Sequence, residues 1–225
     1  MNQLGFFLLF FSGALVTQVP VSGPPTIRPS TVALTAGVNR SWTAPPPLMH
    51  VTDGGGSYPV VRMRAGAEVT MPVRQRLALQ FGAAYSQTGE ISSYVPHPFS
   101  GHPFGGQLIE ERWEVDYLEL SVLGRMRIPD ESKRLGLHVL AGPAVALPVA
   151  CRTGSKTAER LGDCWSTSSR FNVLLYGGAG VDARMTERLG ATVGFLYGLS
   201  LRGFTGATEH LRVLGLRGGL VYRIP

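Results

Sequence analysis

The sequence predicts an all-β fold, an eight-stranded antiparallel up-and-down transmembrane β-barrel preceded by a signal peptide. Eight segments after residue 30 alternate apolar with small or polar residues at a period of two, as strands with two different faces do. The connections between these segments alternate in length, and the 225-residue chain combines 29 glycines with only two lysines. Such a composition is not typical of a soluble helical protein.

The N-terminal residues predict export. The run from Leu4 to Val16 has almost no polar residues, and it is too short for a transmembrane helix but long enough for a signal-peptide core. We assign residues 1–23 to a signal peptide with an approximate cleavage point, residues 24–30 to a short Pro-rich periplasmic lead-in, and residues 31–225 to the barrel. No cysteine follows the apolar run, so nothing indicates a lipid-modified N-terminus.

The first half of the barrel region contains four predicted strands, each with one apolar face. They are Thr31–Trp42, Tyr58–Thr70, Arg76–Gln87 and Trp113–Ile128. In the second of them, one face reads Val61, Met63, Ala65, Ala67 and Val69, and the other reads Arg62, Arg64, Gly66, Glu68 and Thr70. The apolar face of this strand carries no charge.

The second half repeats the pattern in Leu135–Leu147, Phe171–Met185, Leu189–Arg202 and Leu211–Ile224. Each of the eight segments has at least the roughly 9 to 11 residues that a tilted strand needs to cross a bilayer. The last one reads polar-x-Gly-x-x-aromatic-x-apolar and ends one residue before the C-terminus. It is typical of a terminal barrel strand, so we expect the barrel-assembly machinery to recognise Gly219, Tyr222 and Ile224 during insertion.

Connection length is a second indication that does not depend on hydropathy. Three connections are short: Met71–Gln75, Pro129–Arg134 and Met185–Arg188. Three are long, namely Thr43–Ser57, Thr88–Arg112 and Pro148–Arg170, and Gly203–His210 is intermediate. Bacterial barrels have short periplasmic turns and long outer loops, and an even number of strands places both termini in the periplasm.

The content of the two faces separates a membrane barrel from a soluble barrel such as a lipocalin, which also alternates. The apolar face has no Lys, Arg, Asp or Glu in its central band, where lipid would penalise an Arg or Lys by about 2 to 4 kcal/mol. The opposite face mixes glycine and alanine with arginine and glutamate, as a narrow interior requires. We therefore expect the bacterial outer membrane.

Four short motifs, in order, resemble the PorT-like outer-membrane β-barrel family. Tyr117–Leu123, followed by Arg125 and Arg127, is similar to the Tyr-Leu-Glu-Ile-Pro motif strand of that family. Leu137–Ala144 with its Leu-Ala-Gly-Pro core, Gly177–Val181 and Leu196–Leu199 resemble the strands that follow. Ser121 stands where the family often has proline, and Pro225 ends the chain where an aromatic residue is usual. The resemblance covers most of Thr31–Ile224 and implies an eight-stranded barrel related to small OmpX-type proteins, without implying a single activity.

The charged residues of the small-residue face are the first candidate site. They are Arg62, Arg64, Glu68, Glu119, Arg125, Arg127, Asp182, Arg184, Arg217 and Arg223. Eight strands leave an interior just wide enough for side chains to fill, and an unpaired buried charge is costly. We expect carboxylates that bridge arginines in a plugged interior; an anion-selective path is the alternative, and the surplus of arginine leaves room for bound anions.

The longest predicted outer loop holds the second candidate, the repeat His97-Pro98-Phe99-Ser100 and Gly101-His102-Pro103-Phe104. His97, Phe99, His102 and Phe104 are candidates for contact with an envelope protein partner. The alternative is a proline-fixed loop whose aromatics pack on the barrel rim. No third ligand is evident beside the two histidines, so we expect no metal site and no cofactor.

Arg40 and Arg212 are the third candidate, since barrel closure makes the first and last strands neighbours. Both are predicted to face lipid near the long loops, where with Trp42 they can bind lipid phosphates. The alternative is ordinary snorkelling or pairing with acids of the loops.

The only two cysteines, Cys151 and Cys164, are expected to form a disulfide in a long outer loop, because an exported protein with a pair at this spacing favours a bridge over two free thiols.

Two function classes are set aside on composition. The formal net charge of +6 comes almost wholly from arginines that recur singly along apolar stretches, so we expect no nucleic-acid partner. Ser92, Ser93, Ser100, Glu110 and Glu111 share a loop with the two histidines without forming a catalytic constellation, and His138 is expected to be a hydrogen-bonded filler. We therefore expect no enzyme.

The leading functional prediction is a monomeric outer-membrane barrel that contacts lipid and acts as a structural or interaction module, such as an envelope or secretion accessory or a surface-binding protein. The alternative is a narrow, anion-biased transport channel, and a lipid-modifying enzyme is the third class.

Overall fold

The computed structural model describes residues 30–43, 56–94, 109–129, 134–155, 162–163, 171–201 and 211–224. The predicted signal peptide and all but the last residue of the lead-in lie outside this part of the chain. The described residues form nine strands: β1 (Thr31–Thr43), β2 (Gly56–Pro72), β3 (Leu77–Tyr94), β4 (Ile109–Arg127), β5 (Leu135–Ser155), β6 (Gly162–Asp163), β7 (Asn172–Arg184), β8 (Leu189–Ser200) and β9 (Leu211–Arg223). None of the described residues belongs to a helix that is long and apolar enough to cross a membrane.

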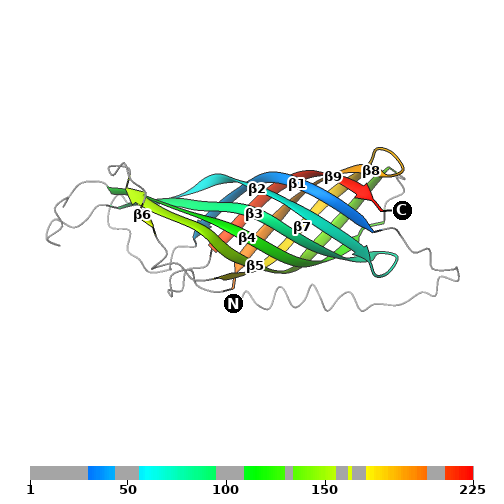
Figure 1. Ribbon diagram of the computed structural model, residues 1–225, viewed down its shortest axis with the longest axis horizontal. Helices are drawn as coiled ribbons and strands as arrows, with labels where there is room; N and C mark the ends of the chain where they lie inside the picture. The colour runs from blue at the N-terminus through cyan, green and yellow to red at the C-terminus, as the bar shows by residue number, and fades with distance from the viewer. Residues whose placement is uncertain are drawn as a thin grey trace.

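Eight of these strands close into an antiparallel barrel in chain order. Each strand pairs with the next, β5 pairs with β7, and β9 returns to β1, where Thr31 lies opposite Arg223 and Thr43 opposite Leu211. The short β6 pairs only with β5, at Arg152 and Thr153. Figure 1 shows the long strands tilted around one elongated barrel. The closed strand order confirms the predicted eight-stranded antiparallel up-and-down barrel, and the signal peptide stays a prediction.

The two ends of the barrel differ. Residues 73–76 join β2 to β3 and residues 185–188 join β7 to β8, at the same end as the start of β1 and the end of β9. We call this the short-turn end, and Figure 1 shows it at the right, beside the C-terminus. The opposite end, which carries β6, is called the long-loop end.

Three strands continue past the barrel wall at the long-loop end, further than predicted. β3 ends at Tyr94 rather than Gln87, β4 begins at Ile109 rather than Trp113, and β5 ends at Ser155 rather than Leu147. The pairing of β3, β4 and β5 runs through residues 88–94, 109–115 and 149–155, which we call the extension. The predicted loops were therefore wrong in these parts. The physical reason is that backbone hydrogen bonding continues where no continuous apolar face marks it in the sequence.

Two register shifts separate the barrel from the extension. The pairing of β2 with β3 shifts between Pro59 and Arg64, and that of β4 with β5 shifts between Asp116 and Tyr117, opposite Pro148. Proline has no N–H to donate to the ladder, so it is confined to edges and bulges, and bulges are common at barrel rims. Alternation is lost here, because Val115, Asp116 and Tyr117 are all buried.

The outward face of the barrel is apolar, and the inward face carries the charged side chains together with some apolar ones. Leu34 and Leu220 are cross-strand partners that are 67% and 65% exposed, whereas Thr35, Glu68 and Arg217 are buried. No charged side chain occupies the outward positions within 32–38, 61–71, 77–85, 118–126, 135–147, 173–185, 189–199 and 214–224. This distribution is the inverse of a water-soluble barrel, whose apolar side chains line the inside.

Candidate functional site

The middle of the barrel interior is organised around one buried carboxylate. Glu119 is 2% exposed, and its Oε2 accepts hydrogen bonds from Arg64 Nη2 at 2.9 Å and from the Tyr176 hydroxyl at 3.0 Å. The Arg64 guanidinium also lies 5.8 Å from the centre of the Tyr176 ring, within cation–π range. Inward positions of β2, β4 and β7 supply these three groups, so one cluster spans the interior from wall to wall.

Gln80 connects a second cluster of interior side chains to a third. Arg217 pairs with Glu68, whose other oxygen accepts a hydrogen bond from Gln80 Nε2 at 2.8 Å. The Gln80 Oε1 lies 3.4 Å from Arg125 Nη1, and Arg125 pairs with Asp182. A chain of charges and one amide therefore connects β9, β2, β3, β4 and β7 across the interior. Charges joined in this way stabilise one another, although Asp182 Oδ1 is buried without a hydrogen-bond partner among the described residues.

His138 lies at the Arg125–Asp182 end of this series of charges and is 3% exposed. Its Nδ1 is 3.0 Å from Arg125 Nη2 and 3.6 Å from Asp182 Oδ2. Arginine has no acceptor, so the bond to Nδ1 requires the tautomer with its proton on Nε2. His138 is thus a hydrogen-bonded filler of the wall, as the sequence suggested.

Glu114 is a partly buried residue of the extension whose contacts sequence reasoning missed. Both Arg62 and Arg112 pair with it near the long-loop end. Strict alternation along β4 would make it face outward with Leu118 and Leu120. The register shift between Asp116 and Tyr117 changes that alternation. Nothing in the sequence alone marks the position of that shift except Pro148.

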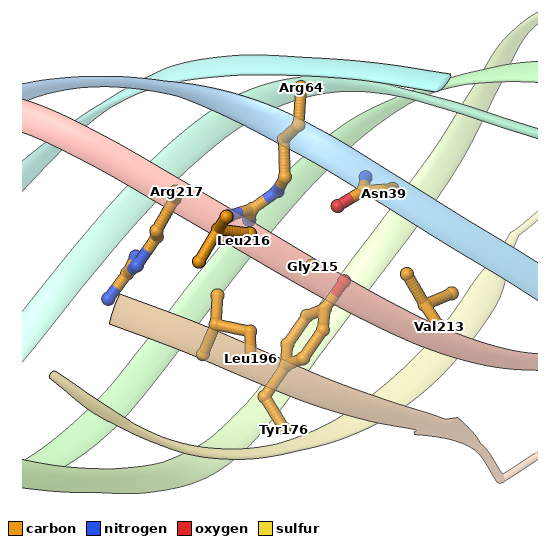
Figure 2. Close-up of a pocket in the computed structure, with 8 residues that line it drawn as sticks. All are labelled: Asn39, Arg64, Tyr176, Leu196, Val213, Gly215, Leu216 and Arg217. Carbon is orange, nitrogen blue, oxygen red and sulfur yellow. The ribbon is translucent and has the colours of Figure 1, made fainter. Parts of the chain in front are cut away.

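Apolar side chains fill the space that the charges leave. Leu123, Leu140, Leu174, Tyr176 and Leu196 belong to one buried cluster inside the barrel. Figure 2 shows Arg64, Tyr176, Leu196 and Arg217 directed into the same region. The cavity that they line measures about 10 Å³, roughly the space of one water molecule. The middle of the barrel is therefore densely packed.

Large interior side chains lie over glycines of neighbouring strands. A Cβ added to Gly198 would stand 2.5 Å from the Tyr176 ring, and one added to Gly180 would stand 2.8 Å from the His138 ring. The glycine-rich face is thus the counterpart of the bulky one, since a narrow barrel fits large side chains only beside small ones.

The remaining predicted charges lie at the short-turn end, outside the packed middle. Arg127, Arg184 and Arg223 surround a wider cavity of about 450 Å³ that opens at this end. Arg125, Asp182 and His138 line it as well. The predicted charge network therefore divides into a densely packed middle part and an open basic mouth.

The structure places the three candidate lipid-contact residues together on the outer surface. Trp42 is the direct cross-strand partner of Arg212, and Arg40 lies two residues before Trp42 on the same face. The Trp42 ring packs at 6.5 Å against that of Tyr197. The Arg212 Nε is buried and has no hydrogen-bond partner among the described residues. An arginine opposite an aromatic side chain on an otherwise apolar surface is suited to a lipid phosphate.

The candidate assembly residues lie at the end of β9. Tyr222 and Ile224 face outward and are 41% and 40% exposed, and the Ile224 amide donates to the Ser30 carbonyl at 2.9 Å. A Cβ on Gly219 would stand 2.2 Å from the Leu34 carbonyl oxygen, so β9 and β1 approach closely at the seam.

The structure does not describe five of the predicted site residues. His97, Phe99, His102, Phe104 and Cys164 lie outside the described residues. Cys151 is buried in β5, and the next residue, Arg152, pairs with Asp163, the residue before Cys164. This pairing brings the two cysteine-bearing segments together, and the bridge itself stays a prediction. Among the described residues, no group of three His, Cys, Asp or Glu side chains is placed to hold a metal ion.

Comparison with known proteins gives structural matches and no sequence match. No protein-family model matches the chain, and no curated protein matches it. The resemblance to the PorT-like family therefore stays a hypothesis.

Among solved structures, the chain is similar to Neisserial surface protein A, with 10% identity over 87% of this chain and 97% of that one and a TM-score of 0.48. It is also similar to the outer membrane protein OprG from Pseudomonas aeruginosa, with 12% identity over 88% and 97% and a TM-score of 0.48. Outer Membrane Protein W of E. coli matches with 14% identity over 88% and 99% and a TM-score of 0.43. The fold of this chain is established by its own strand pairing.

Proposed function

We propose that the protein spans a bacterial outer membrane as a plugged barrel and serves there as a structural or interaction module. The observation that carries the membrane assignment is the uncharged outward face, on which large apolar side chains such as Leu34, Leu216 and Leu220 are more than half exposed. In water this surface would drive aggregation, whereas in lipid it is the favoured surface. Closure of β9 on β1 also leaves no sheet edge unpaired in lipid.

The proposed orientation follows from the two ends. Short turns and both ends of the described barrel, Thr31 and Arg223, lie together, and bacterial barrels keep such turns in the periplasm. The extension then projects from the outer surface. Trp42, Tyr197 and Arg212 lie at the level where the barrel passes into the extension, which suits the outer lipid–water boundary.

The plug is proposed because the middle of the interior is filled. The Arg64–Glu119–Tyr176 cluster joins β2 to the opposite strand β7, the Arg217–Glu68–Gln80 cluster joins β9, β2 and β3, and the cavity beside them holds about 10 Å³. Ions cannot pass such a section without displacing paired charges. A closed barrel does not conduct, but its projecting extension can contact other molecules, so we include an interaction role. No catalytic role is part of the proposal.

Single-channel recording in planar bilayers tests the plug. We expect no steps from the purified full chain. The double variant Glu68→Ala with Arg217→Ala removes both charges of one pair, so it leaves no unpaired arginine or carboxylate there, and we expect it to conduct. Steady anion-selective steps from the parent protein would instead support the channel alternative, which the basic mouth at the short-turn end favours.

Site-specific photo-cross-linking in outer membranes tests the interaction role. A photoreactive residue replaces Tyr58, which is 61% exposed where β2 pairs with the extension, and the control replaces Leu77, which is 45% exposed at the short-turn end. We expect a discrete protein adduct from position 58 only. Lipid adducts alone at both positions would mean a stand-alone barrel and would contradict the interaction role.

A further inference from the structure

The short-turn end contains an open cavity whose chemistry the closed middle does not explain. Its volume is about 450 Å³, within the usual range of small-molecule sites. Among the described residues, six arginines line it: Arg74, Arg76, Arg125, Arg127, Arg184 and Arg223.

The cavity has a large excess of positive charge. Asp182 is the one carboxylate among the described residues that line it, and Arg125 pairs with Asp182. With His138 neutral, as its bond from Arg125 requires, the lining has a formal excess of five positive charges. Like charges gathered in a partly enclosed space repel, and a bound anion relieves that repulsion.

Four separate parts of the chain contribute these arginines, which explains why the sequence did not show them as a cluster. Arg125 and Arg127 take inward positions at the end of β4, while Arg184 and Arg223 do so at the ends of β7 and β9. The β2–β3 turn brings Arg74 and Arg76 to the rim. Ring closure therefore brings together residues that are as far apart in sequence as Arg74 and Arg223.

The cavity is a dead end. Arg125, Asp182 and His138 line it and belong to the charge chain that continues through Gln80 into the filled middle. A ligand would therefore enter and leave by the same mouth. This geometry describes a binding site more closely than a path.

We propose that this cavity binds a soluble anion that carries two or more phosphate groups. Guanidinium groups donate paired hydrogen bonds to phosphate oxygens, and several of them arranged around one space suit a multivalent anion better than a single carboxylate. The proposal goes beyond the structural role. It does not depend on whether the barrel conducts ions or on any protein partner.

Titration calorimetry with sodium tripolyphosphate tests it, on the full chain in phosphatidylcholine nanodiscs. We expect saturable binding that weakens as salt is raised. The double variant Arg127→Gln with Arg184→Gln should weaken binding by roughly tenfold or more, because each lost charge-assisted bond is substantial. The matched control is Arg112→Gln with Arg152→Gln, which removes the same charge from the extension and should leave binding unchanged.

A variant of opposite sign guards against loss of folding as the explanation. Asp182→Asn removes the carboxylate from the lining, so we expect binding to tighten by about threefold or more. Heat-modifiable migration in gels confirms for each variant that the barrel has formed. Equal weakening in the cavity and control variants would mean non-specific attraction to a basic protein and would overturn the site.

The source of the phosphates is separated by lipid composition. Nanodiscs with cardiolipin offer paired phosphates as a headgroup, whereas phosphatidylcholine discs offer no net negative charge. We expect tripolyphosphate to bind in the latter. If cardiolipin is retained but tripolyphosphate does not bind, the site belongs to a lipid headgroup and the soluble ligand is refuted.

Discussion

At the scale of single residues, Glu119 holds the middle of the interior together. Its carboxylate is nearly inaccessible and receives bonds from both Arg64 and Tyr176. An arginine left inside the barrel without this partner would have neither water nor a counter-charge at that point, and removal of one partner of a buried pair is strongly destabilising.

We expect Glu119→Gln to lower the free energy of unfolding by about 3 to 5 kcal/mol. The measurement is a urea titration of the folded fraction in lipid vesicles. Glu187→Gln, in the exposed β7–β8 turn, is the matched control and should leave the midpoint nearly unchanged. Equal midpoints for the two variants would contradict the role of Glu119.

Two glycines on adjacent strands give a second test at this scale. Gly198→Ala places a methyl group 2.5 Å from the buried Tyr176 ring, whereas Gly177→Ala meets nothing within 4 Å. Overpacking of this kind costs about 1 to 3 kcal/mol, so we expect the first variant to be destabilised and the second to match the parent. Thermal unfolding of both proteins in the same detergent measures the difference, and similar melting temperatures would mean that Tyr176 moves aside freely.

At the scale of strands, the outward face of the barrel decides where each strand can lie. Leu216 stands in the middle of β9 between Val38 and Phe195 and is 58% exposed. All three are apolar, and no charged side chain occupies the outward positions of the wall strands within the ranges given above; Arg40 and Arg212 lie outward only toward the long-loop end. Under the proposed function, lipid covers this face.

Leu216→Arg should therefore reduce insertion into vesicles, with a cost of about 2 to 4 kcal/mol for a charge at the depth of the bilayer centre. Tyr58→Arg introduces the same charge beyond the closed part of the wall and should insert like the parent. The folded fraction after dilution from urea into vesicles distinguishes them. Insertion of the Leu216 variant at the parental level would place this face outside the membrane.

The extension gives another prediction at the level of strands. β5 and β6 pair at Arg152 and Asp163, immediately beside Cys151 and Cys164. We expect a disulfide between these cysteines that links the two strands. Intact-mass measurement under non-reducing conditions, with thiol alkylation, checks it, and alkylation of both cysteines would refute the bridge.

At the scale of the whole molecule, a closed wall and a paired interior predict resistance to detergent. Every wall strand has two partners, and β1 and β9 pair along the whole of β1. We expect unheated protein to migrate differently from boiled protein in dodecyl sulfate gels, and to sediment with outer membranes. Identical migration together with recovery in the soluble fraction would contradict the membrane assignment.

The sequence by itself determined the wall of this barrel. Alternation at a period of two identified eight strands and assigned Arg64, Glu68, Glu119 and Arg217 to the interior face, and the structure has each of them inside. This succeeds because one face meets apolar surroundings and the other a narrow polar interior, so each strand carries its orientation in its own residues.

Only the tertiary structure decided which interior residues meet and where the strands end. The pairing of Arg62 with Glu114 depends on a register shift, and the bridge through Gln80 depends on three strands at once. The basic mouth likewise arises from arginines that ring closure brings together. These features depend on how strands are aligned across the barrel, and alignment is a property of the closed sheet rather than of any one segment.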